Sequence, residues 1–203
     1  MLNFNINYKK IDYDNLENYY LIGDIHFCHK NITNLVNRPS NWKEKIIENW
    51  KNTVRDSDTV ILVGDVCFSV KNYKPCAEII NNLPGKKILI YGNHDRWMKG
   101  RIFRVEYDFI LSNLFVKINR SNTSINVFIQ HYPPTERDIM SLREKHGRYV
   151  HLFIHSHSHD TKPFIYTING TPVVNVSVEA TNYKVVSFRS VIDEVIKKGL
   201  VSI

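Results

Sequence analysis

The chain has 203 residues, of which 43% are hydrophobic and 23% charged, and it carries a formal net charge of +7. This composition, without low-complexity or Pro/Gly-rich stretches, excludes a disordered chain and predicts one domain, residues 1–203, that buries roughly 70% of its unfolded surface. The N-terminal eleven residues lack the apolar core of a signal peptide and no run is long enough to span a membrane, so we expect a cytoplasmic protein with no membrane partner.

The first half of the chain alternates short apolar runs with helical patterns. Buried strands, each rich in Ile, Leu or Val, are predicted at Tyr19–Gly23, Thr59–Gly64 and Lys87–Tyr91. Between them we expect a helix from an N-cap at Ser40 to about Val54 and a shorter helix at Pro75–Asn82. Strands separated by helices predict parallel βαβ units.

The second half is richer in strands. Two runs, Leu114–Ile118 and Ser124–Gln130, flank a polar turn and predict a hairpin. Thr135 with Asp138 forms a capping-box pattern that opens a helix to about His146. The remaining elements are strands at Tyr149–Ile154, Pro172–Val176 and Tyr183–Phe188, and a final helix capped by Ser190 with Asp193. Two sheets packed face to face with helices outside satisfy both halves, so we expect an α/β (α+β) domain built as a four-layer αββα sandwich.

Charge and cysteines bear on partners and redox state. The 27 Lys and Arg exceed the 20 Asp and Glu, with a pI near 9.2, which favours phosphate-rich ligands. The same excess of Lys beside many Asn and Ile is also what an AT-rich genome produces, so nucleic acid stays open as a partner, and the oligomeric state is open too. Cys28, Cys67 and Cys76 are odd in number and lack CxxC spacing, so we expect reduced, buried thiols.

Metal-binding residue types follow the predicted strands directly. They are Asp24 and His26, Asp65, Asn93, His94 and Asp95, His131, and His155, His157 and His159. Loops at the carboxyl ends of strands in an open α/β sheet share one edge and form its binding crevice, so separate segments are expected to converge on one site.

Such a set suits two divalent ions about 3.5 to 4 Å apart, which need carboxylate, amide and imidazole ligands and one bridging oxygen. Residues at i and i+2 of an extended segment point the same way, so Asp24 with His26, and His157 with His159, are expected to present paired ligands. Two Asp charges against two dications leave a bare site near roughly +2, which suits a phosphate dianion.

These motifs resemble those of the calcineurin-like metallophosphoesterase superfamily, and they occur along the chain in the same order. The matching segments are Gly23-Asp24-Ile25-His26, Gly64-Asp65, Gly92-Asn93-His94-Asp95, His131 and His157-Ser158-His159. Further likeness, to small bacterial and phage predicted phosphoesterases, lies in Phe27–Ile32, Asn49-Trp50 and Asn182-Tyr183-Lys184. A GNHD after a predicted strand is a specific signal, whereas a lone DxH or GD is weak.

The resemblance implies a sandwich of the metallo-dependent phosphatase type and a role for each matching residue. One metal would be held by Asp24, His26, Asp65 and His159, and the other by Asp65, Asn93, His131 and His157. His94 would protonate the leaving oxygen or stabilise charge at phosphorus, with Asp95 orienting its ring. The implied cofactors are two divalent ions, Mn first, with Fe, Zn or Ni as alternatives.

The expected activity is hydrolysis of a phosphomonoester or phosphodiester, with a nucleotide-like substrate favoured. The alternatives are a nuclease or RNA-processing phosphodiesterase, and a non-catalytic scaffold that keeps the fold. The chain lacks the GDxxDRG pattern of Ser/Thr protein phosphatases after Asp65, which disfavours a phosphoprotein substrate.

Some assignments stay open within this interpretation. The family usually has Gly where this chain has Ser156, so His155 with His157 competes with the favoured pair His157 and His159. His29 either reaches substrate or caps the next helix. Arg96 opens a basic, aromatic segment to Arg101 that either holds substrate phosphate or is a solvated helix face.

Overall fold

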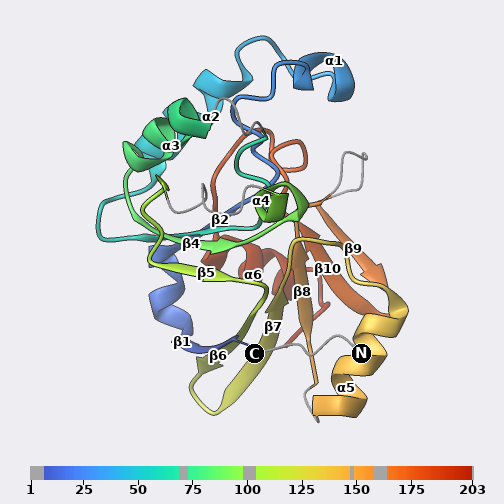
Figure 1. Cartoon of the computed structure of the whole chain (residues 1–203). Coiled ribbons are helices and arrows are strands. Elements are labelled where there is room, and N and C mark those ends of the chain that lie inside the picture. The colour runs from blue at the N-terminus through green and yellow to red at the C-terminus, as the bar shows by residue number, and fades with distance from the viewer. Residues whose placement is uncertain (1–6, 69–72, 98–103, 147–148, 158–163, 203) are drawn as a thin grey trace.

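The domain is a sandwich of two sheets with helices on both outer faces (Figure 1). The computed structural model describes residues 7–68, 73–97, 104–146, 149–157 and 164–202. Its helices are α1 Ile32–Val36, α2 Trp42–Thr53, α3 Tyr73–Asn81, α4 Asn93–Trp97, α5 Glu136–His146 and α6 Phe188–Lys197. All of these helices are too short or too polar to traverse a lipid bilayer. The predicted α/β class and four-layer αββα arrangement are confirmed.

The five-stranded sheet carries the three parallel strands predicted from the first half. Its order is β11 (Val186–Ser187), β2 (Tyr19–Ile22), β3 (Thr59–Leu62), β4 (Lys86–Ile90) and β5 (Phe109–Leu111). Its central strands β3 and β4 end in the apolar runs Val60–Leu62 and Ile88–Ile90, which are buried on both faces of the sheet. Leu21 and Ile61 point into the core between the sheets, whereas Ile22 and Leu62 pack against α2 and α3 with Ile46 and other apolar residues.

The six-stranded sheet supplies the other half of the sandwich. Its order is β1 (Asn7–Asp12), β6 (Leu114–Arg120), β7 (Thr123–Ile129), β8 (Leu152–His155), β10 (Thr171–Asn175) and β9 (Ile165–Ile168). The hairpin of β6 and β7 is antiparallel, as predicted. Its inner face faces the other sheet through Val116, Val127 and Ile154, and its outer face packs Phe128 and Phe153 against α5.

Helix caps test the local predictions. The capping box of α5 is confirmed, since Asp138 Oδ2 accepts the Thr135 N–H at 2.8 Å and Thr135 Oγ1 accepts the Asp138 N–H at 3.2 Å. The predicted cap of the last helix is wrong. Ser187 is the N-cap and its hydroxyl accepts the Ser190 N–H, while Asp193 instead accepts a hydrogen bond from the Tyr13 hydroxyl.

The expectation of reduced thiols is also wrong. A disulfide joins Cys67, which follows β3, to Cys76 in α3, with Cα atoms 6.3 Å apart. Both half-cystines are buried in the core beneath α2 and α3, and Cys28 is the free thiol. Spacing along the chain could not reveal this pairing, because it depends on α3 folding back against the loop that follows β3.

The disulfide predicts a labelling pattern. In denaturant without reductant, an alkylating reagent should modify one cysteine per chain, and three after reduction, as counted by intact mass. Reduction should also lower the free energy of unfolding by about 2–3 kcal/mol, because closing a short loop restricts the unfolded chain. As a control, Cys28→Ser should take up no label before reduction. Three labels on the unreduced wild type would contradict the bond.

Candidate metal centre

The residues expected at the site converge at one edge of the sandwich, where β2, β3, β4, β7 and β8 end. Two groups of side chains bring one potential ligand atom each to within 4.8 Å of the others, and Asp65 belongs to both. The first group is Asp24, Asp65, His131 and His157, and the second is His26, Asp65 and His94. Figure 1 shows α4, which carries His94, at the upper ends of β8 and β10.

Asp65 lies at the centre of this cluster and is fully buried. Its Oδ1 accepts the backbone N–H of His94 at 2.9 Å. Its Oδ2 faces imidazole nitrogens, with Nε2 of His131, His94 and His26 at 3.4, 3.8 and 3.9 Å, and it accepts no well-aligned hydrogen bond from the described residues. A buried carboxylate oxygen placed like this, beside nitrogen ligands from three loops, has the environment of a bridging metal ligand.

Asp65 and His131 stabilise each other's charged forms. Burial alone would raise the pKa of Asp65, but the close approach and charge of His131, with the charges of His26 and His94, outweigh it and hold that pKa below its ordinary value. Burial likewise favours neutral His131, but Asp65 and Asp24 outweigh it and raise the His131 pKa. The cluster therefore keeps Asp65 ionised, as a metal ligand must be.

The first metal-binding loop is not extended, so the i and i+2 argument for Asp24 and His26 is wrong in its geometry. Asp24 has a φ of 52° and His26 a φ of 55°, both in the left-handed region that non-glycine residues rarely adopt. The backbone is held there by hydrogen bonds to the loop after β3, from Asp24 N–H to Gly64 and from His26 N–H to Asp65, at 3.0 and 2.9 Å. Strained backbone of this kind is typical of functional sites.

A buried arginine braces the same loop from behind. Arg38 donates to the carbonyl oxygens of Ile25 and Asp24 at 2.6 and 2.7 Å, and to the Glu179 carboxylate at 2.6 Å. Its guanidinium lies 4.7 Å from the centre of the Trp42 ring, and the side chain is fully buried. Arg38 thus ties the loop after β2 to the segment after β10.

Asp95 holds loops together and does not contact the His94 ring in the hydrogen bonds described. Its Oδ2 accepts the N–H groups of Asp65 and Gly92 at 2.7 and 2.8 Å, and its Oδ1 accepts that of Val66 at 3.3 Å. Burial, with the nearby Asp65 carboxylate, raises the pKa of Asp95 to about 6 despite these hydrogen bonds. The geometry gives Asp95 a positioning role, joining the loops after β3 and β4, in place of the expected orientation of His94.

His131 is oriented by the backbone of the neighbouring sheet. Its Nδ1 lies 3.0 Å from the carbonyl oxygen of Val63, so Nδ1 carries the proton and Nε2 is turned to Asp65 and to Asn93 Oδ1, which is 3.1 Å away. Ser156, the departure from the family pattern, hydrogen-bonds the same carbonyl and lies 3.2 Å from His131 Nδ1. Such support of the distal ring nitrogen is typical of metal-binding histidines.

Two histidines of the run that Ser156 interrupts have different neighbours. His157 groups with the site, and its backbone N–H donates to the His131 carbonyl at 2.8 Å. His155 instead ends β8 and contacts the Tyr166 hydroxyl through Nε2 at 2.8 Å. His159 lies outside the described residues, as does most of the basic segment after α4, and only the backbone of Arg96 is described.

His29 lies between the start of the next helix and the site. Its Nδ1 accepts the N–H of Asn31, the residue that precedes α1, at 3.2 Å. Its ring also packs against Phe68, with centroids 3.7 Å apart, and Phe68 in turn contacts the His94 ring at 4.6 Å. His29 is therefore a neighbour of the site through Phe68.

The donor set suits divalent cations. Asp24 and Asp65 are both fully buried carboxylates, and two such charges are stable inside a protein only if cations compensate them. The glycines of the motifs leave the necessary room: a Cβ at Gly92 would lie 2.7 Å from His131 Nε2, and one at Gly64, where φ is 86°, would lie 2.7 Å from His131 Cγ. The residues therefore fit a metal centre.

Comparison with known proteins decides the family. Residues 18–117 match the model of the calcineurin-like phosphoesterases. The chain is 35% identical over 187 residues to the uncharacterized protein MJ1445 of Methanocaldococcus jannaschii, covering 90% of this chain and 93% of that protein. It belongs to the calcineurin-like phosphoesterase family. A crystal structure of the protein of unknown function AQ665 from Aquifex aeolicus is similar with a TM-score of 0.65 and 26% identity, over 87% of this chain and 98% of that one.

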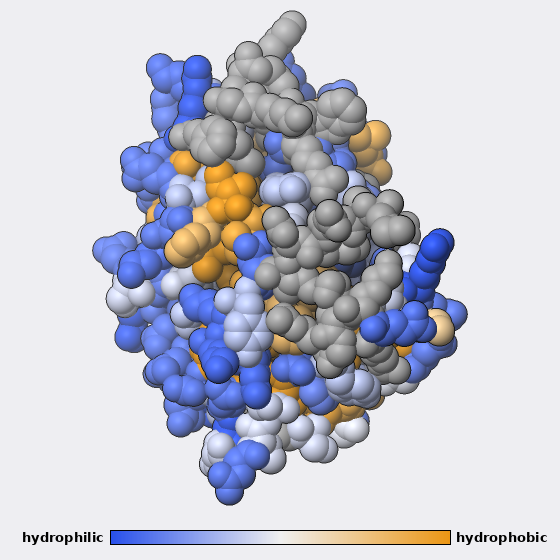
Figure 2. Space-filling model, turned by 60° about the horizontal axis from the view of Figure 1, so that its bottom comes forward, coloured by the Kyte–Doolittle hydropathy of each residue, from blue (hydrophilic) through white to orange (hydrophobic). Residues whose placement is uncertain are grey.

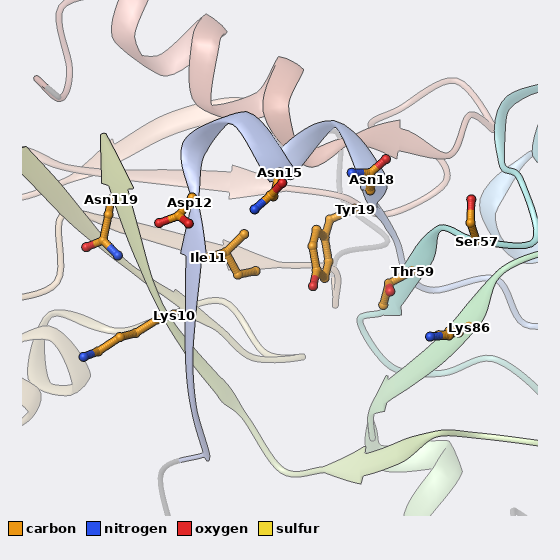
Figure 3. A pocket seen from close by; sticks show the side chains of 10 residues that line it. All are labelled: Lys10, Ile11, Asp12, Asn15, Asn18, Tyr19, Ser57, Thr59, Lys86 and Asn119. Carbon is orange, nitrogen blue, oxygen red and sulfur yellow. The ribbon is translucent and has the colours of Figure 1, made fainter. Parts of the chain in front are cut away.

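Family membership agrees with a metal-binding role for the cluster. The cluster is distinct from a large recess of the molecule. As a calcineurin-like phosphoesterase, the chain belongs to a family that binds divalent metals, and the described His and Asp groups suit them. A recess of about 640 Å³ opens elsewhere, between Lys10 and Asn119 on one sheet and Tyr19, Thr59 and Lys86 on the other (Figure 3). The last three begin β2, β3 and β4, so the recess lies at the opposite strand ends from the metal centre.

Several residues in and around the candidate metal centre were not predicted from sequence. Ser156 was seen only as a departure from the pattern. Phe68 and Tyr132 lie three residues after Asp65 and one after His131, so their proximity in sequence could have drawn attention to them. Arg38 carries no sequence signal, because it reaches the loop after β2 only through the fold.

Proposed function

We propose that the chain hydrolyses a phosphomonoester or phosphodiester, with a nucleotide-like substrate favoured, at two divalent cations held around Asp65. The observation that carries the proposal is the fully buried Asp65 carboxylate, whose Oδ2 faces imidazole nitrogens from three separate loops. Structural ion pairs rarely gather several histidines around one carboxylate, and hydrolytic metal sites do.

The ligands would come from both halves of the cluster. Asp24, His26, Asp65 and His159 would hold one ion, and Asp65, Asn93, His131 and His157 the other, with Asp65 as the bridge. Bound there, the cations would neutralise the charge of the phosphate and lower the pKa of an attacking water. Mn is the first choice, with Fe, Zn or Ni as alternatives, because mixed oxygen and nitrogen ligands suit all four.

His94 would be the catalytic acid. Its side chain is 28% exposed, whereas His26 and His131 are almost fully buried, so the His94 imidazole is the one of these three that can meet substrate from solvent. The hydrogen bond from its backbone to Asp65 Oδ1 holds it beside the proposed bridging carboxylate. From there Nε2 would donate a proton to the leaving oxygen or stabilise charge on the phosphoryl group.

An assay of purified protein tests the proposal. After removal of bound metal and reloading with Mn²⁺, Zn²⁺ or Fe²⁺, the chain should cleave bis(p-nitrophenyl) phosphate or p-nitrophenyl phosphate, and chelation should abolish turnover. A panel of monoester, linear diester, cyclic nucleotide and oligonucleotide then separates the possible substrate classes. A nuclease would cleave the oligonucleotide with activity that falls steeply as salt rises. No turnover with any ester and any metal would contradict the proposal and favour a non-catalytic scaffold.

A further inference from the structure

Two exposed aromatic rings lie against the metal centre. Phe68, from the loop that carries Asp65, is 38% exposed, and Tyr132, which follows His131, is 42% exposed. Hydrophilic residues cover much of the face shown in Figure 2, on which an apolar patch also lies. Both rings touch histidines of the cluster.

Each ring packs on a different half of the cluster. The Phe68 centroid lies 4.6 Å from that of His94 and 3.7 Å from that of His29. The Tyr132 centroid lies 5.0 Å from that of His131 and 4.9 Å from that of His157. Phe68 therefore contacts one of the two groups of candidate ligands that share Asp65, and Tyr132 contacts the other.

Contacts of the main chain anchor the segments that carry both rings. The Phe68 N–H donates to the Phe27 carbonyl at 3.3 Å, and the preceding Cys67 is anchored to α3 by its disulfide. The Tyr132 carbonyl accepts a hydrogen bond from Gln130 Nε2 at 2.9 Å. Anchored aromatic residues bind planar groups well because little conformational freedom is lost on binding.

We propose that Phe68 and Tyr132 form a subsite that stacks the nucleobases of a nucleotide substrate; this inference rests on the proposed phosphoesterase function. In a nucleotide, one sugar joins a planar nucleobase to the phosphate ester. Every nucleobase can stack on an aromatic side chain, so stacking does not depend on which base is present. Because Phe68 packs on His94, the proposed proton donor, it stacks the base of the leaving nucleoside. Tyr132, on the other ligand group, stacks the second base of a diester.

The test compares substrates that differ only in the base. Metal-loaded wild type should have a kcat/KM for adenosine 5′-monophosphate about 5- to 150-fold above that for ribose 5-phosphate, the range found for stacking of a base on an aromatic side chain. In Phe68→Ala and Phe68→Leu the ratio of kcat/KM for adenosine 5′-monophosphate to kcat/KM for ribose 5-phosphate should fall to near unity, and Phe68→Trp should restore it. Because Leu keeps the apolar volume, its failure to rescue separates stacking from packing.

Dinucleotide substrates test the role of the second ring, Tyr132, and adenosine tests binding of the base itself. Tyr132→Ala should lower the ratio of kcat/KM for a dinucleoside monophosphate to kcat/KM for adenosine 5′-monophosphate by roughly 5-fold or more. Phe109→Ala, in an exposed ring on β5, is the matched control and should change neither ratio. Binding of adenosine, which has no phosphate to cleave, should weaken in Phe68→Ala by a similar factor when titrated calorimetrically.

The outcomes distinguish failure of the stacking subsite from failure of the proposed phosphoesterase function. Turnover of bis(p-nitrophenyl) phosphate together with equal use of adenosine monophosphate and ribose 5-phosphate would overturn the stacking subsite and leave the phosphoesterase intact. An unchanged base preference in Phe68→Leu would also overturn it. Absence of turnover with every ester would overturn both.

Discussion

Replacing Asp65 with Asn should reduce metal-dependent turnover by roughly 10³-fold or more. The change removes the negative charge of the proposed bridging ligand, so the bound cations lose several kcal/mol of stabilisation. The variant keeps an oxygen that can accept the His94 N–H, so the fold around Oδ1 is retained. Turnover with saturating Mn²⁺ and metal content per chain are the measurements, and both should fall together.

Asp58 offers a matched control for this change. It is also a buried aspartate, 4% exposed, and it accepts the Arg55 N–H at 2.8 Å, but it precedes β3 and so lies at the opposite strand ends. Asp58→Asn should cost stability and leave metal content and turnover per folded molecule unchanged. Full activity in Asp65→Asn would remove the basis for a shared carboxylate.

Replacing Arg38 with Met should destabilise the fold by about 3–5 kcal/mol, the cost of breaking a buried ion pair and leaving its partners without donors. The carbonyl groups of Asp24 and Ile25 lose their donors, and Glu179 loses its counter-ion. The free energy of unfolding from urea titration of metal-free protein is the measurement. Metal affinity should fall as well, because the strained loop that presents Asp24 loses its brace.

Two further variants separate charge from geometry at this position. Arg38→Lys keeps the charge but cannot reach both carbonyls and the carboxylate, so it should recover only part of the stability. Arg189→Met removes a cation that is 30% exposed and lies over the Tyr13 ring, and it should cost about 1 kcal/mol or less. Equal losses for Arg38→Met and Arg189→Met would refute the bracing role.

The layered fold was predictable from the chain because its central strands are apolar on both faces. The apolar runs Val60–Leu62 and Ile88–Ile90 are most stable in the middle of a covered sheet. The edges were missed for the converse reason. Half of β1 faces solvent and its sequence mixes Lys and Asn with apolar residues, so it lacks a strand signal and is a strand only because it pairs with β6.

At the candidate site, the convergence of several side chains was predictable and their backbone geometry was not. Position after a strand placed Asp24, Asp65 and His131 correctly at one edge. Sequence could not show that Asp24 and His26 adopt left-handed backbone, since that conformation depends on hydrogen bonds to the next loop. For the same reason it could not show that Asp95 binds backbone amides, because those amides belong to loops brought together only by the sheet.

The disulfide and the exposed aromatic rings could not be predicted, because sequence does not show contacts or solvent exposure. Cys67 and Cys76 are separated by nine positions, and their pairing follows from how α3 packs on the loop after β3. Phe68 is an ordinary apolar residue in the sequence, and only its exposure beside His94 gives it a role. Such features become visible when solvent exposure and neighbours are known.

Anomalous diffraction from crystals of the Mn-loaded protein tests the two-metal centre most directly. We expect two anomalous peaks about 3.5–4 Å apart on either side of the Asp65 carboxylate, with imidazole nitrogens of His26 and His131 among their ligands. A single peak away from Asp65, or no peak near it under saturating Mn²⁺, would contradict the account.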